Sequence, residues 1–195
     1  MDGEREKIVT AIARAVAEYG YAQLTLKEVL GYAGVTSKEF EAHFQSLEQG
    51  LIAAQEAFLE RLRLEVAAAC DLERPWPDNV RAALEAALSY VAEANAMARG
   101  FAVEATAASL AACERQYAAL ETLADLLRQG RRFYPRAAQM PAATERALVG
   151  GVASIVADRL LSEEPHSLAD LEPQLVEFLL VPYLGRAGAS EFTQT

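Results

Sequence analysis

Residues 25–44 read TLKEVLGYAGVTSKEFEAHF, and this stretch predicts two short helices joined by a tight turn. Thr25 and Thr36 each stand three residues before a glutamate, which is the spacing of a capping box at a helix start. A glycine lies where the chain must turn between the two helices. Phe40 and Phe44 are four residues apart, so they share one face of the second helix. This layout is that of a helix-turn-helix, whose second helix enters the major groove of DNA.

The flanking segments predict one helix on either side of this pair. The preceding helix ends at Gly20, a residue type that commonly terminates helices. After the pair, Ser46 can cap a long helix that runs to about Cys70. The helix before the pair carries an apolar stripe at helical spacing, formed by Ile8, Ile12, Ala15, Val16 and Tyr19.

The string IVTAIARAVAEYGYAQLTLKEVLGYAGVTSKEFEAHFQSLEQGL, residues 8–51, resembles the N-terminal domain of the TetR (tetracycline-repressor) family. The resemblance implies an all-α protein with a three-helix helix-turn-helix domain at 1–46. It also implies a C-terminal six-helix bundle for effector binding and dimerisation at 47–184. The implied function is a ligand-responsive transcriptional regulator, a repressor, that binds a palindromic operator as a homodimer. Residues 185–195, with two glycines and several polar residues, are expected to form a flexible tail.

The chain departs from the family pattern on the predicted recognition helix. Glu39, Glu41 and Leu47 stand where the family usually has threonine, tyrosine and lysine, and residues 1–50 hold eight acidic but only five basic side chains. DNA phosphates attract positive charge and repel carboxylates, so the alternative is a TetR-like protein with weak or lost operator binding. The Glu39 carboxylate can be explained as part of the capping box. The Glu41 carboxylate could instead accept a hydrogen bond from the amino group of a cytosine. The expected DNA contacts are Thr25, Lys27, Thr36, Ser37, Lys38, Glu41 and His43.

Composition limits the class of protein. The hydrophobic fraction of 52% suits a helical bundle, and the net charge of −10 argues against a general nucleic-acid or membrane-surface binder. No apolar run approaches the ~20 residues that cross a membrane, and the charged start does not resemble a signal peptide. Cys70 and Cys113 suggest reduced thiols, so a cytoplasmic location is expected. No role is assigned to Cys113.

The rest of the chain is predicted to be helical, with breaks at the proline- and glycine-rich segments. The final two helices are apolar on one side, and the resemblance implies that they pair with their copies in a dimer. The alternative is an intramolecular core with a kink at the glycines. The expected interface residues are Leu148, Gly151, Val152, Ile155, Leu171, Leu175 and Phe178.

Aromatic and methionine residues in the middle helices could line a pocket for an apolar or amphipathic effector, although an ordinary core would show the same pattern. Arg128 and Arg131 belong to an arginine cluster that fits either a helix C-terminus or an anionic partner. No catalytic constellation, metal-ligand spacing or cofactor motif is recognisable, so no enzyme activity is expected. The expected ligand contacts are Phe58, Leu62, Tyr90, Met97, Phe101, Glu104, Tyr117 and Leu120.

Overall fold

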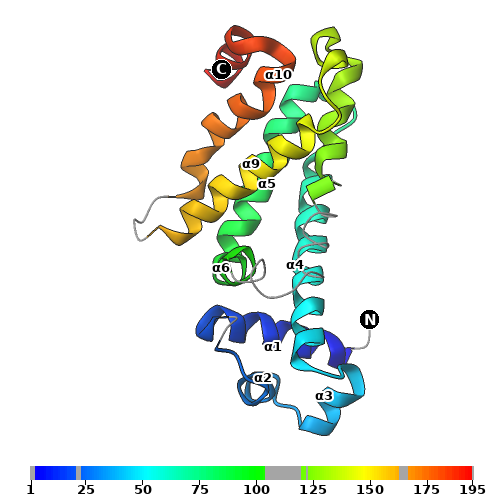
Figure 1. Ribbon diagram of the computed structural model, residues 1–195, viewed down its shortest axis with the longest axis vertical. Helices are drawn as coiled ribbons and strands as arrows, with labels where there is room; N and C mark the ends of the chain where they lie inside the picture. The colour runs from blue at the N-terminus through cyan, green and yellow to red at the C-terminus, as the bar shows by residue number, and fades with distance from the viewer. Residues whose placement is uncertain (1–2, 21–22, 104–119, 122, 163–166, 195) are drawn as a thin grey trace. The chain divides into compact units, whose positions relative to one another are not determined.

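The computed structural model describes residues 3–20, 23–103, 120–121, 123–162 and 167–194, and within these residues every regular element is helical (Figure 1). The chain divides into two compact units. Unit 1 is Met1–Arg61 with Ala94–Arg115, and unit 2 is Leu62–Glu93 with Gln116–Thr195. The all-α fold class predicted from the sequence is therefore confirmed.

Unit 1 is built around the first helix. Its elements are α1 (Gly3–Tyr19), α2 (Leu26–Ala33), α3 (Ser37–His43), the first part of α4 (Leu47–Ala69) and α6 (Asn95–Val103). Ile8, Ile12 and Val16 of α1 are buried as the apolar stripe predicts, whereas Tyr19 remains 42% exposed. Gly20 has a φ of 76°, a left-handed conformation that favours glycine and ends α1.

Glycines allow two further helices to lie close to the core of unit 1. A Cβ atom at Gly50 of α4 would lie 2.6 Å from Ile12 Cδ1, and one at Gly100 of α6 would lie 2.3 Å from Val16 Cγ1. The first part of α4 therefore packs against α1 and α3, and α6 packs against α1. The compact unit thus extends beyond the boundary at residue 46 that the sequence suggested.

Unit 2 places α5 (Trp76–Glu93) and α9 (Thr144–Leu161) in contact with α10 (Glu172–Thr193), as Figure 1 shows. Residues 123–128 are also helical and lead into the 3₁₀ helices η1 (Gln129–Arg132) and η2 (Pro135–Gln139). A third 3₁₀ helix, η3 (Leu168–Leu171), is capped by the Ser167 side chain and precedes α10. The core of the unit consists of apolar residues from these helices, among them Val80, Leu84, Leu148, Leu175, Val176 and Leu180.

The C-terminus is ordered into helix, so the expectation of a flexible tail at 185–195 is wrong. Gly185 (φ 76°, ψ 167°) redirects the chain, and helical structure resumes to Thr193 with Ala189 fully buried. Arg81 of α5 holds this segment, because its Nη2 donates to the Phe192 carbonyl at 2.5 Å and its guanidinium lies 4.3 Å from the Phe192 ring centre. The glycine therefore marks a change of direction and not the end of the fold.

No helix among the described residues is both long and apolar enough to cross a membrane.

Candidate functional site

The helix-turn-helix forms as predicted in unit 1. Gly34 takes the left-handed conformation (φ 58°, ψ 41°) at the end of α2, and its N–H donates to the Leu30 carbonyl. Thr36 then begins α3, and the Glu39 carboxylate accepts from the Thr36 N–H at 2.6 Å and from its hydroxyl at 2.8 Å. Thr25 opens α2 in the same way, donating its N–H to Glu28 at 3.0 Å. Both capping boxes predicted from the sequence are therefore confirmed.

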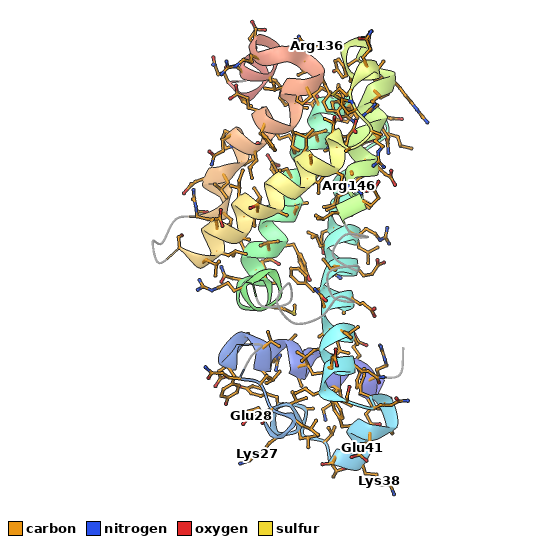
Figure 2. All side chains as sticks on the ribbon, viewed as in Figure 1. Lys27, Glu28, Lys38, Glu41, Arg136 and Arg146 are labelled. Atoms are coloured by element: carbon orange, nitrogen blue, oxygen red, sulfur yellow. The ribbon has the colours of Figure 1, made fainter. Side chains whose placement is uncertain are left out.

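Burial divides α3 into an inner and an outer face. Phe40 is 1% exposed and Phe44, just after the helix, is 4% exposed, with their ring centres 5.5 Å apart. Lys38 and Glu41 are exposed on the other side, and Figure 2 shows them projecting from α3 with Lys27 projecting from α2. The outer face can therefore meet a partner without disturbing the core.

The expected DNA-contact residues differ in their freedom to bind. Ser37, Lys38 and Glu41 are exposed, and Glu41 forms no ion pair or hydrogen bond within the described part of the chain. Thr25 and Thr36 are also exposed, but their hydroxyls serve the capping boxes. The imidazole of His43 has only 13% of its surface exposed and lies 3.1 Å from the Glu4 carboxylate of α1. His43 is therefore turned towards α1, which the sequence did not indicate.

The charge of Glu39 is fixed by its partner in the capping box. Hydrogen bonds from the Thr36 backbone and hydroxyl hold the pKa of the Glu39 carboxyl below its ordinary value. The side chain therefore carries its negative charge at neutral pH, but it is committed to the start of α3. Glu41 is the carboxylate on this helix that remains available to a partner.

Unit 2 contains a cavity of about 290 Å³. Its wall combines the second part of α4, α5, residues 123–129, α9 and α10, and most of its side chains are aliphatic. The polar residues of the wall are Cys70, Asp71, Asn79 and Gln129. The main apolar side chains of the wall are Val66, Val80, Leu84, Leu126, Val149 and Leu179.

Two of the polar wall residues are occupied by bonds within the protein. Asn79 accepts from the Asp71 N–H at 2.8 Å and donates to the Asp71 carbonyl at 2.7 Å, so it closes the loop between α4 and α5. The Cys70 thiol lies 3.3 Å from the Val66 carbonyl, and burial raises its pKa. The thiol is therefore protonated at neutral pH, which lowers its reactivity.

Trp76 forms part of the cavity wall and is held by an aromatic cluster. Its ring centre lies 4.5 Å from that of Tyr183 and 5.6 Å from that of Tyr134. A Cβ atom at Gly130 would lie 2.4 Å from Trp76 Cζ2, so only glycine leaves room for the indole at this position. These contacts fix the indole on the cavity side.

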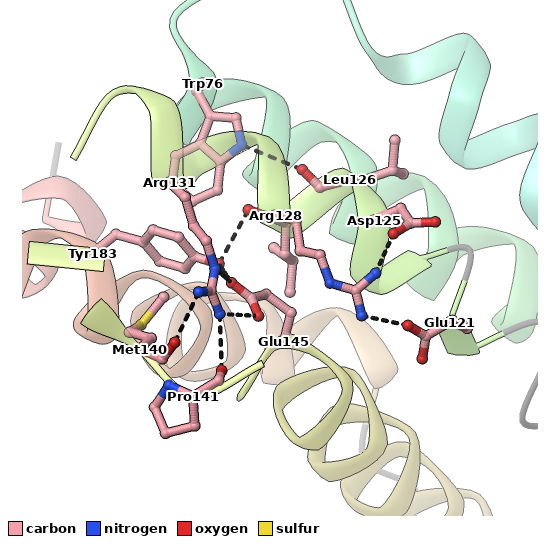
Figure 3. A network of polar contacts seen from close by, with 11 residues as sticks. Trp76, Glu121, Asp125, Leu126, Arg128, Arg131, Met140, Pro141, Glu145 and Tyr183 are labelled. Atoms are coloured by element: carbon pink, nitrogen blue, oxygen red, sulfur yellow. Dashed lines mark hydrogen bonds and ion pairs between the residues drawn. The ribbon is translucent and has the colours of Figure 1, made fainter. Parts of the chain in front are cut away.

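A buried polar network lies beside the aromatic cluster (Figure 3). Glu145, fully buried, accepts from Arg131 Nε at 2.6 Å and from Arg131 Nη2 at 2.7 Å. The same guanidinium donates to the carbonyls of Met140 and Pro141 at 2.8 and 2.9 Å. The Tyr183 hydroxyl lies 3.1 Å from Glu145 and 3.0 Å from the Leu127 carbonyl. The guanidinium and carboxylate therefore neutralise each other inside the protein.

The protonation states of the residues in this network follow from burial and from the groups that each residue contacts. Burial alone would raise the pKa of Glu145, but the hydrogen bonds and charge of Arg131 outweigh it, and the pKa is lowered. Burial and the Glu145 charge both raise the pKa of Tyr183. The network therefore consists of a charged carboxylate, a charged guanidinium and a neutral phenol at neutral pH. The sequence showed Arg131 only as part of an arginine cluster and gave no sign of its partners.

The ligand contacts expected from the sequence do not coincide with this cavity. Phe58, Leu62, Tyr90, Met97 and Leu120 are described by the structure, and none of them lines it. Glu104, Tyr117 and the side chain of Phe101 lie outside the described residues, as does Cys113. The cavity is instead lined by residues such as Trp76, which stands between two prolines in one of the segments where the sequence predicts a break between helices.

The expected dimer residues fall into three groups. Leu148, Leu171 and Leu175 are buried within unit 2, so they belong to the core of one chain. Ile155 and Phe178 are 38% and 40% exposed, so they remain available. The two others are half-buried: Gly151 lies beneath the Phe178 ring, and Val152 contributes to the cavity wall.

Comparison with known proteins identifies the fold. No protein-family model and no curated protein sequence matches the chain. Among solved structures, the fatty acid degradation regulator FadR from Bacillus halodurans has a TM-score of 0.82 at 17% identity, over 92% of this chain and 96% of that one. A regulatory protein of the TetR family from Rhodococcus RHA1 has a TM-score of 0.71 at 16% identity, over 94% and 98%.

A third neighbour was solved with a ligand. FadR from Bacillus subtilis in complex with stearoyl-CoA has a TM-score of 0.72 at 17% identity, over 92% of this chain and 98% of that one. These neighbours match almost the full length of both chains. At this level of identity the likeness establishes the fold, and the chain has the fold of the TetR-family transcriptional regulators.

Proposed function

We propose that the chain is a ligand-responsive transcriptional regulator of the TetR family, a repressor, that binds a palindromic operator as a homodimer in the cytoplasm. The observation that carries this proposal is the division of α3 into a buried face with Phe40 and an exposed face with Lys38 and Glu41. This is the arrangement by which a helix-turn-helix presents side chains to the major groove. The fold and the cavity of unit 2 support an effector-responsive role.

The test of DNA binding is a selection of bound sequences from random duplexes at low salt, followed by titration of the selected site. Lys38→Ala should weaken binding and reduce the salt dependence by about one unit of slope per lysine, because a phosphate contact is lost. Glu41→Tyr should strengthen binding by removing a repelling charge. Arg146→Ala is the matched control, since Arg146 is exposed on α9, outside the helix-turn-helix (Figure 2).

The outcomes separate the two readings of this domain. Selection of a palindrome supports the regulator. If Glu41→Tyr abolishes binding to that site, Glu41 is a specificity contact and not a defect. If no sequence is enriched even at low salt, the alternative replaces the regulator: a TetR-like ligand-binding or protein-interaction protein without operator binding.

We propose that the dimer forms through the exposed apolar side chains of α9 and α10. Gly150 offers a sharper test than Gly151. A Cβ atom at Gly151 would lie 3.1 Å from the Phe178 ring of the same chain, whereas one at Gly150 would meet nothing within 4 Å. A Cβ atom at Gly150 therefore meets no other part of the single chain, so we expect a leucine there to act mainly on a partner.

Sedimentation at micromolar concentration should show a dimer for the unmodified chain and dissociation for Gly150→Leu. Gly31→Leu is the matched control, because Gly31 is a helical glycine of α2 that also has open space around it. A stable monomer of the unmodified chain would exclude the proposed dimer.

A further inference from the structure

We propose that the cavity of unit 2 binds a compact aromatic molecule of about two fused rings that is neutral or carries one positive charge, and that it rejects anions. This inference rests on the proposed effector role but concerns only what the cavity accepts. It differs from the ligand of the Bacillus subtilis neighbour, since stearoyl-CoA is long and carries several phosphates.

The size of the cavity limits the ligand. A dry apolar cavity of about 150 Å³ holds one benzene molecule. The cavity here is about 290 Å³, so by this comparison it accommodates about two such rings. It also lies at the lower end of the range of about 300–1,000 Å³ that small-molecule pockets occupy. A long acyl chain joined to a nucleotide would extend beyond this volume.

The wall favours an aromatic body. Val80, Leu84 and Leu179 offer aliphatic contact, and Trp76 offers an indole ring that is packed against Tyr183 and Tyr134. A ring that is already fixed loses little conformational entropy when a ligand packs against it. Aromatic pairs add about 0.5–1.5 kcal/mol beyond the buried area. A planar aromatic ligand therefore gains more from this wall than an aliphatic one of the same size.

The charge of the wall is negative. Asp71 is the one ionisable acid or base, apart from the Cys70 thiol, among the described residues that line the cavity. Its carboxylate accepts from the Glu73 N–H at 3.0 Å, and the residue is exposed, which places the charge at the solvent side of the wall. A cationic group on the ligand can meet this carboxylate, whereas an anionic group would be repelled.

The nearby arginines are not available to an anion. Arg131 is paired with buried Glu145, and Arg128 is paired with Glu121 and Asp125 (Figure 3). Arg74, which follows the loop residue Asp71, donates to the Ala69 carbonyl at 3.1 Å and does not line the cavity. The described wall therefore contains no cation to neutralise a carboxylate or phosphate.

The test uses three probes with one ring system: 1-naphthylmethylamine, 1-naphthalenemethanol and 1-naphthoate. Binding to the full chain is measured by calorimetry and by the fluorescence of Trp76, the single tryptophan of the sequence. The amine and the alcohol should bind, and the naphthoate should bind at least about tenfold more weakly, or about 1.4 kcal/mol. Equal or tighter binding of naphthoate would overturn the charge assignment.

Three variants locate the site. Asp71→Asn should weaken the amine several-fold and leave the alcohol unchanged, and an unchanged amine would show that Asp71 does not select charge. Ala83→Phe, which places a ring in the cavity, should abolish binding of all three probes, with Ala87→Leu as a second filling variant. Binding that survives both filling variants, or no binding of any probe to the unmodified chain, would overturn the proposal. Operator binding is measured separately without ligand. The proposal that the chain is a DNA-binding regulator can therefore hold even if this inference about the ligand fails.

Discussion

Glu39 in the helix-turn-helix and Glu145 in unit 2 are both ionised glutamates that organise a structure, but they do so over different distances. Glu39 accepts from Thr36, three residues before it, on an exposed helix. Glu145 is fully buried and accepts from Arg131, 14 residues before it, and from Tyr183, 38 residues after it. An exposed local pair contributes little to stability, whereas removal of one partner from a buried pair is costly.

The same contrast separates the two candidate binding sites. The outer face of α3 presents solvent-exposed charged side chains. A surface that binds a charged polymer such as DNA requires this. The charges beside the cavity of unit 2 are neutralised within the protein, and Asp71 is the charged residue that the described wall exposes to a ligand. Paired charges around an apolar cavity favour neutral ligands because an anion would find no counter-ion.

The largest expected effect is on the buried network. Glu145→Ala should lower the free energy of unfolding of unit 2 by about 1.5–3 kcal/mol, because it leaves the half-buried Arg131 guanidinium and the Tyr183 hydroxyl without this carboxylate. Unfolding in urea is followed by the fluorescence of Trp76, whose ring packs against Tyr183 of the network. The matched comparison is Glu39→Ala, which should leave this fluorescence transition in place.

A double variant tests whether the cost comes from the unpaired charge. Arg131→Met combined with Glu145→Leu replaces both charges by apolar groups of similar size. This pair should recover part of the stability that Glu145→Ala loses, since buried ion pairs are often replaceable by apolar residues. If the double variant is as unstable as Glu145→Ala, the loss is due to packing and the comparison with Glu39 fails.

The next effect concerns the glycine beneath the indole. Gly130→Ala should cost about 1–3 kcal/mol by overpacking, because its Cβ would lie 2.4 Å from the Trp76 ring. Gly31→Ala is the control, since it adds a methyl group in open space on α2 and should stabilise the chain by about 1 kcal/mol. Thermal unfolding of the two variants should shift in opposite directions, and equal shifts would show that Trp76 can move aside.

A smaller effect is expected in unit 1. Thr36→Ala removes the hydroxyl that accepts from the Glu39 N–H at 3.3 Å, and loss of such a cap costs about 1 kcal/mol. Ser37→Ala, one residue later and exposed, is the control and should have little effect. Amide hydrogen exchange in α3 reports the change locally. Exchange that is equally fast in both variants would mean that the cap does not stabilise the recognition helix.

Sequence reasoning succeeded where the determining contacts are local. The capping boxes of Thr25 and Thr36 and the burial of Phe40 and Phe44 depend on residues three or four positions apart, and the pattern shows them directly. The tail prediction failed because Gly185 can end a helix or redirect it, and the contact with Arg81 decides which. A local pattern contains no information about a partner more than a hundred residues away.

The cavity of unit 2 and the buried polar network could not be predicted from the sequence for the same physical reason. The cavity wall brings Trp76 and Leu179 together, and the polar network brings Arg131 and Tyr183 together. These residues are far apart in the sequence, and a helical periodicity does not show such contacts. The sequence pattern places His43 on the exposed face of its helix. In the structure its imidazole lies beside the Glu4 carboxylate of α1 and is largely buried. The sequence pattern shows on which face of a helix a residue lies. Which other helix that face contacts depends on the tertiary packing.

The smallest expected effect is the pH dependence of the capping box. Because the folded-state pKa of Glu39 is lowered, its contribution to stability is fully present above the ordinary glutamate pKa of about 4.3 and is lost as the pH falls through the folded-state value. Glu39→Gln keeps an acceptor for Thr36 but has no charge, so it should be slightly less stable than the unmodified chain at pH 7. The difference should be smaller at pH 3 than at pH 7, and hydrogen exchange in α3 at both pH values measures it. If the stability difference between the two proteins is the same at both pH values, the Glu39 carboxylate does not act through its charge. Glu39 would then stabilise the helix start only as a neutral polar side chain does.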